Sequence, residues 1–286
     1  MNKNNKKTSR ISEVWRQLRK NKVAVISLCI LIAIVLVAIF APLIAPHPFD
    51  VQNTSRALEP PSKDYPLGTD RLGRDVLSRL IYGSRQSLLM GFASVSIAAV
   101  IGMIIGSIAG YYGGFADNII MRLLDIYQSI PMFLLCVSLA AILGPSLRNA
   151  IIAIGIGLVP NFARLIRVSI LAVREMEYIE AATSINASSG RIISKHIIPN
   201  AIAPLTVEYT MGIGGAILIG AGLSFIGLGV RPPMAEWGSM ISDARDYMRA
   251  HGTLALYPGI CIMITVLAFN LLGDGLRDAL DPRLKN

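Results

Sequence analysis

Ionisable side chains are rare inside the apolar stretches of this 286-residue sequence, so the few that occur there are the first candidates for chemistry. Glu208 lies within one apolar run, while Arg164 and Arg167 lie near the end of another, on one helix face. A charged side chain at the centre of a bilayer costs about 2.5 to 3.5 kcal/mol, so it is kept where it has a partner or a role. These three residues are candidates for lining a translocation pathway, in which the arginines pair with Glu208 or with lipid phosphate. A purely structural role for Glu208 is the competing interpretation.

A polar stretch between two apolar runs carries a second candidate site. Ala181 and Ala182 are strong helix formers with small side chains that permit close approach to another protein, and Glu180 supplies a charge to orient it. Asn186 stands where the first of two short helices must stop, because Asn readily adopts the left-handed conformation. A second helix with one apolar face follows, and Pro199 ends it. The pattern predicts a protein-docking segment; an ordinary amphipathic surface helix is the alternative.

Motifs for nucleotide hydrolysis or metal catalysis do not occur in the sequence, which has no G-x-x-x-x-G-K-[ST], H-E-x-x-H or G-x-S-x-G. The three cysteines each lie within apolar runs and indicate neither a disulfide framework nor a Cys-based metal site. We therefore expect no catalytic residue, cofactor or metal in this chain. An intramembrane enzyme would need a catalytic constellation inside the spans, whereas the three histidines lie outside them.

The composition is typical of a membrane protein. Hydrophobic residues make up 53% of the chain and charged residues only 16%, with a mean hydropathy of +0.56, whereas soluble domains are about a quarter charged. A formal charge of +9 would also suit nucleic-acid binding, but Lys and Arg crowd the first 22 residues and the ends of the apolar runs. That distribution indicates membrane topology, and we expect no nucleic-acid partner.

Six segments are long and apolar enough to cross a hydrocarbon core of about 30 Å as helices, which predicts an all-α integral membrane protein. The first is an uncleaved anchor, because about 22 residues exceed the apolar region of a signal peptide. In the second, Gly102, Gly106 and Gly110 recur every fourth residue and predict a close packing face, within the chain in preference to a subunit interface. The six predicted spans are residues 23–44, 87–110, 119–143, 150–173, 201–229 and 254–272.

The basic residues before the first span predict a cytoplasmic amino terminus. Six crossings then return the carboxyl terminus to the cytoplasm and place the segment between the fourth and fifth spans there too. The chain is expected to consist of a basic cytoplasmic tail, an anchor helix, an extracytoplasmic loop, a core transmembrane domain and a cytoplasmic tail. These are residues 1–22, 23–44, 45–86, 87–272 and 273–286.

The stretch from Glu180 to Pro199 resembles the E-A-A loop of ABC-importer permeases, in which E-A-A is followed by a Gly and the loop closes on a Pro. Asn186 stands where that family usually has Gly, and Asn can adopt the same backbone conformation. In the family the loop forms a cytoplasmic coupling helix between the fourth and fifth spans and docks in a partner ATPase. The resemblance implies that nucleotide-driven motion is transmitted by Glu180, Ala181, Ala182, Asn186 and Pro199.

Other stretches resemble one branch of these permeases, which imports dipeptides, oligopeptides, nickel and glutathione. Residues 66–83 are similar to the outer-loop signature of the branch. Within them Asp70 is a candidate helix cap, and Arg74 can pair locally with Asp75. Similar support comes from residues 125–131, 224–233, 236–238 and 273–283.

The resemblance implies a permease subunit of an ATP-driven importer in the bacterial cytoplasmic (inner) membrane. Its implied partners are a second homologous permease, two P-loop ATPases that bind ATP and Mg²⁺, and an extracytoplasmic substrate-binding protein. Short peptides are favoured over nickel as cargo because no His or Cys ligand set lines the spans, while nickel, a metal chelate and glutathione stay open. A stand-alone secondary transporter, the alternative of a different class, predicts intramembrane carboxylates or inverted repeats; Glu208 is the candidate carboxylate, and no convincing repeat is found.

Overall fold

The computed structural model describes residues 10–179 and 188–280, and within these ranges every extended element is a helix. An isolated antiparallel bridge between Thr69 and Asp75 is the sole β-type pairing among them. In chain order the elements are α1 (Arg10–Leu18), α2 (Lys22–Ile39), α3 (Ala41–Ile44), η1 (Thr54–Arg56), α4 (Val76–Tyr112), α5 (Gly114–Gln128), α6 (Met132–Leu143), α7 (Leu147–Arg174), α9 (Ser189–Ile192), the π-turn η2 (Ile193–Ile197), α10 (Ile198–Phe225), α11 (Trp237–Ala244), η3 (Arg245–Tyr247) and α12 (Thr253–Leu280).

Five of the described helices, α2, α4, α7, α10 and α12, are each long and apolar enough to cross a membrane. The third predicted span differs from the expectation of one continuous helix. It is divided into α5 and α6, which meet at an angle of 83° and make a sixth span only if the pair is counted together. Pro131 stands at the start of α6, and a proline disfavours the helical conformation in the residue before it, so α5 ends ahead of this position.

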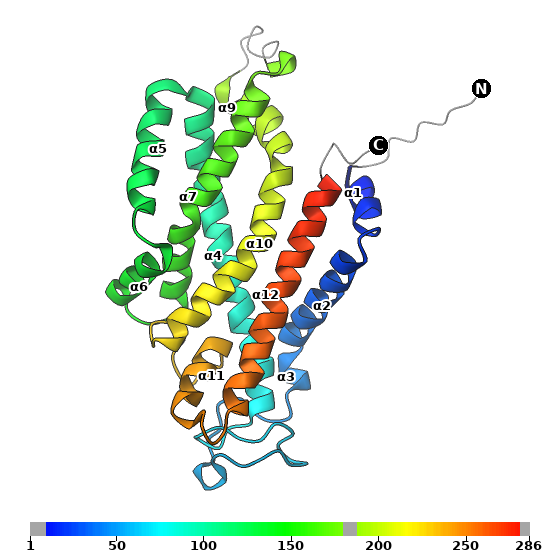
Figure 1. Ribbon diagram of the computed structural model, residues 1–286, viewed down its shortest axis with the longest axis vertical. Helices are drawn as coiled ribbons and strands as arrows, with labels where there is room; N and C mark the ends of the chain where they lie inside the picture. The colour runs from blue at the N-terminus through cyan, green and yellow to red at the C-terminus, as the bar shows by residue number, and fades with distance from the viewer. Residues whose placement is uncertain (1–9, 180–187, 281–286) are drawn as a thin grey trace, which may run out of the picture.

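The helices run between two ends of the molecule (Figure 1). The start of α1, the end of α7, the end of α12 and the helix α9 lie at one end, named here the α9 end. Residues 45–75 and α11 lie at the opposite end, named the α11 end. The described chain therefore begins and finishes on the same side of the bundle.

The closest helix packing joins α4 to α7, which share the most extensive contact among the described elements. A Cβ placed on Gly102 would lie 2.5 Å from the Cβ of Phe162, and one on Gly106 would clash with the carbonyl oxygen of Ala163. Gly110 meets α7 in the same way one turn further on. The predicted intramolecular packing face is confirmed, because only glycine allows the two backbones this approach.

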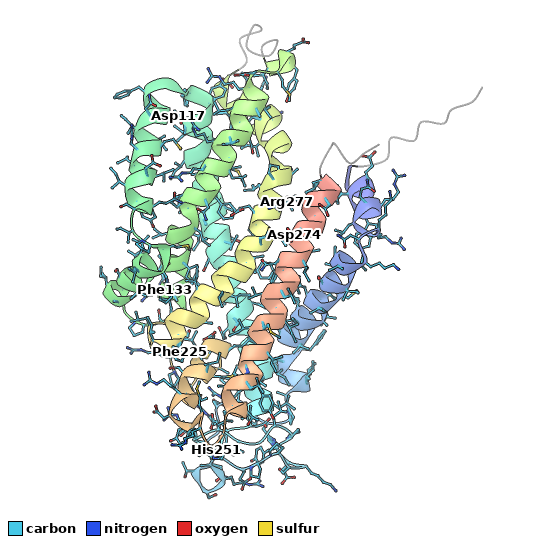
Figure 2. All side chains as sticks on the ribbon, viewed as in Figure 1. Asp117, Phe133, Phe225, His251, Asp274 and Arg277 are labelled. Carbon is cyan, nitrogen blue, oxygen red and sulfur yellow. The ribbon has the colours of Figure 1, made fainter. Side chains whose placement is uncertain are left out.

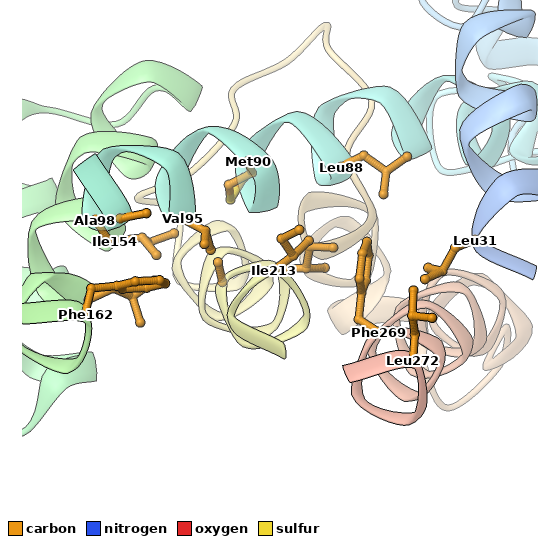
Figure 3. Packing of buried hydrophobic residues seen from close by; sticks show 14 of the residues in the cluster. Leu31, Leu88, Met90, Val95, Ala98, Ile154, Phe162, Ile213, Phe269 and Leu272 are labelled. Carbon is orange, nitrogen blue, oxygen red and sulfur yellow. The ribbon is translucent and has the colours of Figure 1, made fainter. Parts of the chain in front are cut away.

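Apolar side chains from several helices meet along α4 (Figure 3). Val95 of α4, Phe162 of α7 and Ile213 of α10 are all buried and belong to one core cluster, which continues through Phe269 of α12. Leu31 extends the cluster to α2. This core holds α7, α10 and α12 around α4 and so fixes the positions of the polar residues they carry.

One face of α2 is exposed and apolar. The residues buried against the rest of the molecule are Ala24, Ser27, Leu31 and Ala38, and an exposed stripe runs along the opposite side. Cys29 is exposed on this helix, and its thiol is free. The large exposed side chains of the stripe are Val23, Ile26, Ile32, Leu36 and Ile39.

The α11 end is built on the start of α4, which begins earlier than the predicted second span. Asp75 caps the helix by accepting from the Ser78 backbone N–H at 2.9 Å, so residues 76–86 of the predicted loop are helical. Asp70, the predicted cap, instead accepts from the backbone N–H groups of Leu72 and Arg74 at 2.9 and 3.0 Å and closes a turn. Asp75 is the cap because it directly precedes α4, so its side chain reaches the N–H of the third helical residue.

An ion cluster ties this turn to α11. Arg74, whose side chain is 1% exposed, does not pair with Asp75 as predicted; it pairs with Asp70 at 2.6 Å and with Asp243 at 3.1 Å. Arg79, 2% exposed, lies 3.5 Å from Asp70 and 4.0 Å from the Asp243 carboxylate. The buried guanidinium groups are thereby shared between two carboxylates from distant parts of the chain.

Glu236 anchors α11 beside this cluster. Its carboxylate accepts from the backbone N–H groups of Gly238 and Ser239, both at 2.8 Å, and from the Ser87 hydroxyl at 3.3 Å. Burial raises the pKa of the Glu236 carboxyl, and the hydrogen bonds from the two N–H groups oppose that rise. The adjacent Trp237 indole donates to the Leu80 carbonyl at 3.0 Å, which fixes α11 against α4.

Candidate functional site

The segment between α7 and α10 contains the predicted coupling residues. Glu180, Ala181, Ala182 and Asn186 lie outside the described residues, so their prediction stands untested, and of the five only Pro199 is described. Helices lie on both sides of residues 180–187. α7 ends at Arg174, and α9, η2 and α10 follow one another without a break from residue 189 to residue 225.

Pro199 does not end a helix, contrary to the prediction. It occupies the first turn of α10, directly after the five-residue π-turn η2. A proline is well placed at a helix start because its missing N–H would have no partner there. The wider π-turn also provides room for the ring, which would clash with the carbonyl four residues earlier in a regular α-helix. The second short helix is therefore fused to the fifth span.

The predicted amphipathic pattern of this run is confirmed where side chains are described. Ile192 and Ile197 are fully buried, while Arg191 and Lys195 are exposed. Through η2 the run contacts α7, and it continues without a break into α10. The run therefore links the start of the fifth span to the fourth.

Two exposed side chains beside the gap were missed by the sequence reasoning. Met176 and Tyr178 are 46% and 41% exposed, while the neighbouring Ile179 is 3% exposed. The sequence feature that could have revealed them is the alternation of Met176 and Tyr178 with glutamates just after the fourth span. Exposed Met and Tyr are enriched where proteins dock, so these two extend the candidate docking surface.

The two arginines predicted for the pathway are held by α5 rather than by Glu208. Arg167 makes a two-pronged pair with Asp117, with both N–O distances at 2.5 Å. Arg164 donates to Asp125 at 2.6 Å. Asp117 lies on α5 close to the α9 end (Figure 2). The sequence could not reveal these pairs, because the acidic partners precede the arginines by 50 and 39 residues.

Glu208 lies within α10. The helix begins at Ile198, so Glu208 is ten residues, or about 15 Å of helix, from that start and six residues from the start of the apolar span at Ile202. Its side chain is partly buried, and the described residues contain no hydrogen-bond or ion-pair partner for it. The structure does not bring it together with Arg164 and Arg167, so these residues do not form one ion-paired site.

A metal centre finds no support in the described part of the chain, where no group of three or more His, Cys, Asp and Glu residues is placed to hold an ion. The features gathered within it are membrane-crossing helices, an amphipathic segment at one end and polar residues along two spans. Fold and site together define a helical, multi-span membrane protein.

Comparison with known proteins agrees with this class. Residues 102–286 match the family described as binding-protein-dependent transport system inner membrane component, and residues 9–61 match the N-terminal transmembrane domain of oligopeptide transport permease C. The dipeptide transport system permease protein of Alkalihalophilus pseudofirmus is 47% identical over 274 residues, covering 96% of this chain and 90% of that protein. The glutathione transport system permease protein of Pectobacterium atrosepticum is 42% identical over 277 residues, covering 96% and 91%.

A solved structure shares the fold. The inward-facing MetNI methionine ABC transporter superposes with a TM-score of 0.59 at 22% identity, covering 72% of this chain and 97% of the matched chain. The chain belongs to the family of inner-membrane components of binding-protein-dependent transport systems. It is a multi-pass protein of the cytoplasmic membrane, as the resemblance of its motifs implied.

Proposed function

We propose that this chain is a translocation subunit of an ATP-driven importer that carries short peptides into the cell. The observation that carries the proposal is the length of the match to dipeptide permeases. Besides the 47% relative, the dipeptide transport system permease protein of Haemophilus influenzae is 44% identical over 281 residues, or 96% of this chain and 95% of that protein. The identity of these dipeptide permeases, 47% and 44%, exceeds the 42% of the glutathione permease and favours dipeptides as the cargo.

The proposed assembly contains this chain, a second homologous permease, two P-loop ATPases and an extracytoplasmic binding protein. ATP and Mg²⁺ bind to the ATPases, and this chain hydrolyses nothing itself. The segment around Glu180 docks on an ATPase, with Met176 and Tyr178 at its edge. Because the helical run from residue 189 continues into α10, displacement of the docked segment moves the span that carries Glu208. Alternation between outward-open and inward-open forms follows from that movement.

Uptake by a strain deleted for this gene tests the proposal. Labelled dipeptide, pentapeptide, glutathione and nickel are supplied in parallel, and the strain is complemented with wild type, Glu180→Arg or the control Asp278→Arg, at an exposed position of α12. We expect loss of dipeptide uptake, restored by wild type and Asp278→Arg but not by Glu180→Arg. Undiminished peptide uptake in the deleted strain would remove the peptide assignment. Restoration by Glu180→Arg would remove the coupling role of that residue.

Glutathione is the second candidate cargo, because a relative 42% identical over nearly the whole chain is named for its transport. The same uptake experiment separates the two. Selective loss of glutathione uptake would make glutathione the cargo, and loss of nickel uptake alone would indicate a metal importer. If uptake depended on no ATPase, a stand-alone secondary transporter would replace the ABC importer.

A further inference from the structure

Three polar pairs join α5 to α7 and form a row that we name the α5–α7 polar ladder. We propose that this ladder lines the water-filled route through the transporter in the half of the membrane towards the α9 end. The inference rests on the proposed function and assigns part of the route to particular residues. The pairs are Asp117 with Arg167, Asp125 with Arg164, and Gln128 with Asn161.

The ladder runs lengthwise along the two helices. Asn161 lies halfway along α7 and accepts from the Gln128 side-chain amide at 3.0 Å. At 1.5 Å per residue, Arg164 lies about 5 Å and Arg167 about 9 Å nearer the α9 end. The polar groups therefore begin near the middle of a predicted span and continue to one end of it.

Most of the ladder is open on its outer side. The side chains of Arg164 and Asp125 are 41% and 56% exposed, and Gln128 and Asn161 are exposed as well. Only the pair of Arg167 and Asp117 is shielded, at 28% and 14%. That pair anchors the ladder, while the two pairs nearer the middle of the span present polar atoms to whatever fills the space beside α5 and α7.

Hydrocarbon is a poor candidate for that space. A charged group facing lipid at this depth costs about 2.5 to 3.5 kcal/mol or more, and the exposed pair of Arg164 and Asp125 contains two charged groups. The exposed stripe of α2 shows the contrast, because its large side chains are all apolar. The ladder therefore faces water or another protein.

Water fits the exposed pairs better than a dry protein interface. Burying an ion pair in an interface incurs a desolvation cost that the attraction of the two charges often fails to repay. Arg164 donates one hydrogen bond, from Nη2 to Oδ1 of Asp125. Its other N–H groups can therefore donate to water or to a passing solute. The carboxylate of a zwitterionic peptide can accept from the Arg164 guanidinium, and the peptide ammonium can donate to the Asp125 carboxylate. Because the charges of Arg164 and Asp125 cancel, neither end of the peptide is bound tightly.

Cysteine accessibility in the assembled transporter tests the inference. Gln128→Cys and Asn161→Cys, one on each helix, are made with the native cysteines replaced by Ala, and the complex is placed in membrane vesicles. A cationic, membrane-impermeant methanethiosulfonate is added with and without ATP plus vanadate. The matched control is Cys29 on the apolar stripe of α2, kept alone in a variant with Cys136→Ala and Cys261→Ala. We expect both ladder cysteines to react at least tenfold faster than Cys29, at rates that change at least threefold with nucleotide state.

Two results would overturn the inference. Ladder cysteines that react no faster than Cys29 would face lipid or packed protein. Cysteines that react in the isolated chain but not in the complex, with or without nucleotide, would lie in a dry interface with another subunit. Failure of the proposed cargo is distinguishable, because nucleotide-dependent labelling in a complex that imports no peptide would leave the route standing and change only its cargo.

Discussion

Asp243 neutralises buried arginine charge at the α11 end. It accepts from Arg74 at 3.1 Å and lies 4.0 Å from Arg79, and both arginine side chains are almost fully buried. Asp243→Asn would leave the buried guanidinium groups with Asp70 as their one carboxylate. Because an uncompensated buried charge is costly, we expect a loss of about 3 to 5 kcal/mol in stability. The midpoint of thermal unfolding of the purified protein in detergent measures it.

Asp246→Asn is the matched control for that change. Asp246 is 81% exposed and lies 3.7 Å from the exposed Arg245, a type of pair that contributes about 0 to 1 kcal/mol. The same substitution three residues away should therefore leave the midpoint nearly unchanged. Equal effects of the two variants would show that the buried cluster contributes no special stability.

At the residue scale, sequence reasoning found the polar residues but not their partners. It paired Arg74 with the adjacent Asp75, whereas Asp75 caps α4 and the partners of Arg74 are Asp70 and Asp243, the latter 169 residues away. It offered Glu208 or lipid phosphate as the partner of Arg164, whereas the partner is Asp125. Charge pairing across a fold depends on which helices are neighbours, and residue spacing reports only the partners on the same helix.

Among the helices, the contact of α4 with α7 gives a direct test of backbone packing. A Cβ on Gly106 would meet the carbonyl oxygen of Ala163, which cannot rotate away. Gly106→Ala should therefore cost about 1 to 3 kcal/mol through overpacking. Thermal unfolding of the isolated chain in detergent is the measurement.

The same substitution at Gly215 controls for helix propensity. Gly215 is also inside a long helix, but a Cβ there would meet nothing within 4 Å. Gly215→Ala should gain roughly 0.5 to 1 kcal/mol, because alanine loses less backbone entropy. A loss at both positions would contradict the assignment of Gly106 to a packing face.

The pair of Asp117 and Arg167 gives a second test between helices, because it joins α5 to α7. Asp117→Arg alone and Arg167→Asp alone place like charges together and should each lower the unfolding midpoint. The double exchange restores opposite charges, and we expect it to recover a coupling energy of about 0.5 to 3 kcal/mol. Arg122→Asp, at an exposed position of α5, should change little. Strictly additive losses in the double variant would show that the pair does not couple the helices.

Helix existence was predictable from apolar length, but helix breaks were not. Pro131 divides one predicted span into α5 and α6, whereas Pro160, Pro204 and Pro258 lie inside continuous helices. A proline in a span interrupts the helix or is accommodated according to how neighbouring helices satisfy the freed carbonyl groups. That environment is a property of the packed bundle.

For the whole molecule, the basic residues of the α11 end complicate any assignment of sidedness from charge. The structure gives many of them partners, since Arg56 pairs with Glu59 and the arginines of the buried cluster pair with Asp70 and Asp243. The basic residues before α2 include the exposed Arg16, Arg19 and Lys20. Basic residues that flank a span are usually kept in the cytoplasm. The exposed basic residues before α2 therefore favour the α9 end as the cytoplasmic end.

Labelling of intact cells tests this orientation. Lys63→Cys at the α11 end and Lys195→Cys at the α9 end are both at exposed positions, and each is made with the three native cysteines replaced by Ala. An impermeant biotin maleimide should label Lys63→Cys on intact cells and Lys195→Cys only after the cells are permeabilised. The variant with no cysteine fixes the background. The reverse pattern would place the segment between α7 and α10 outside the cell, where no ATPase could dock, and the coupling mechanism would fail together with the orientation.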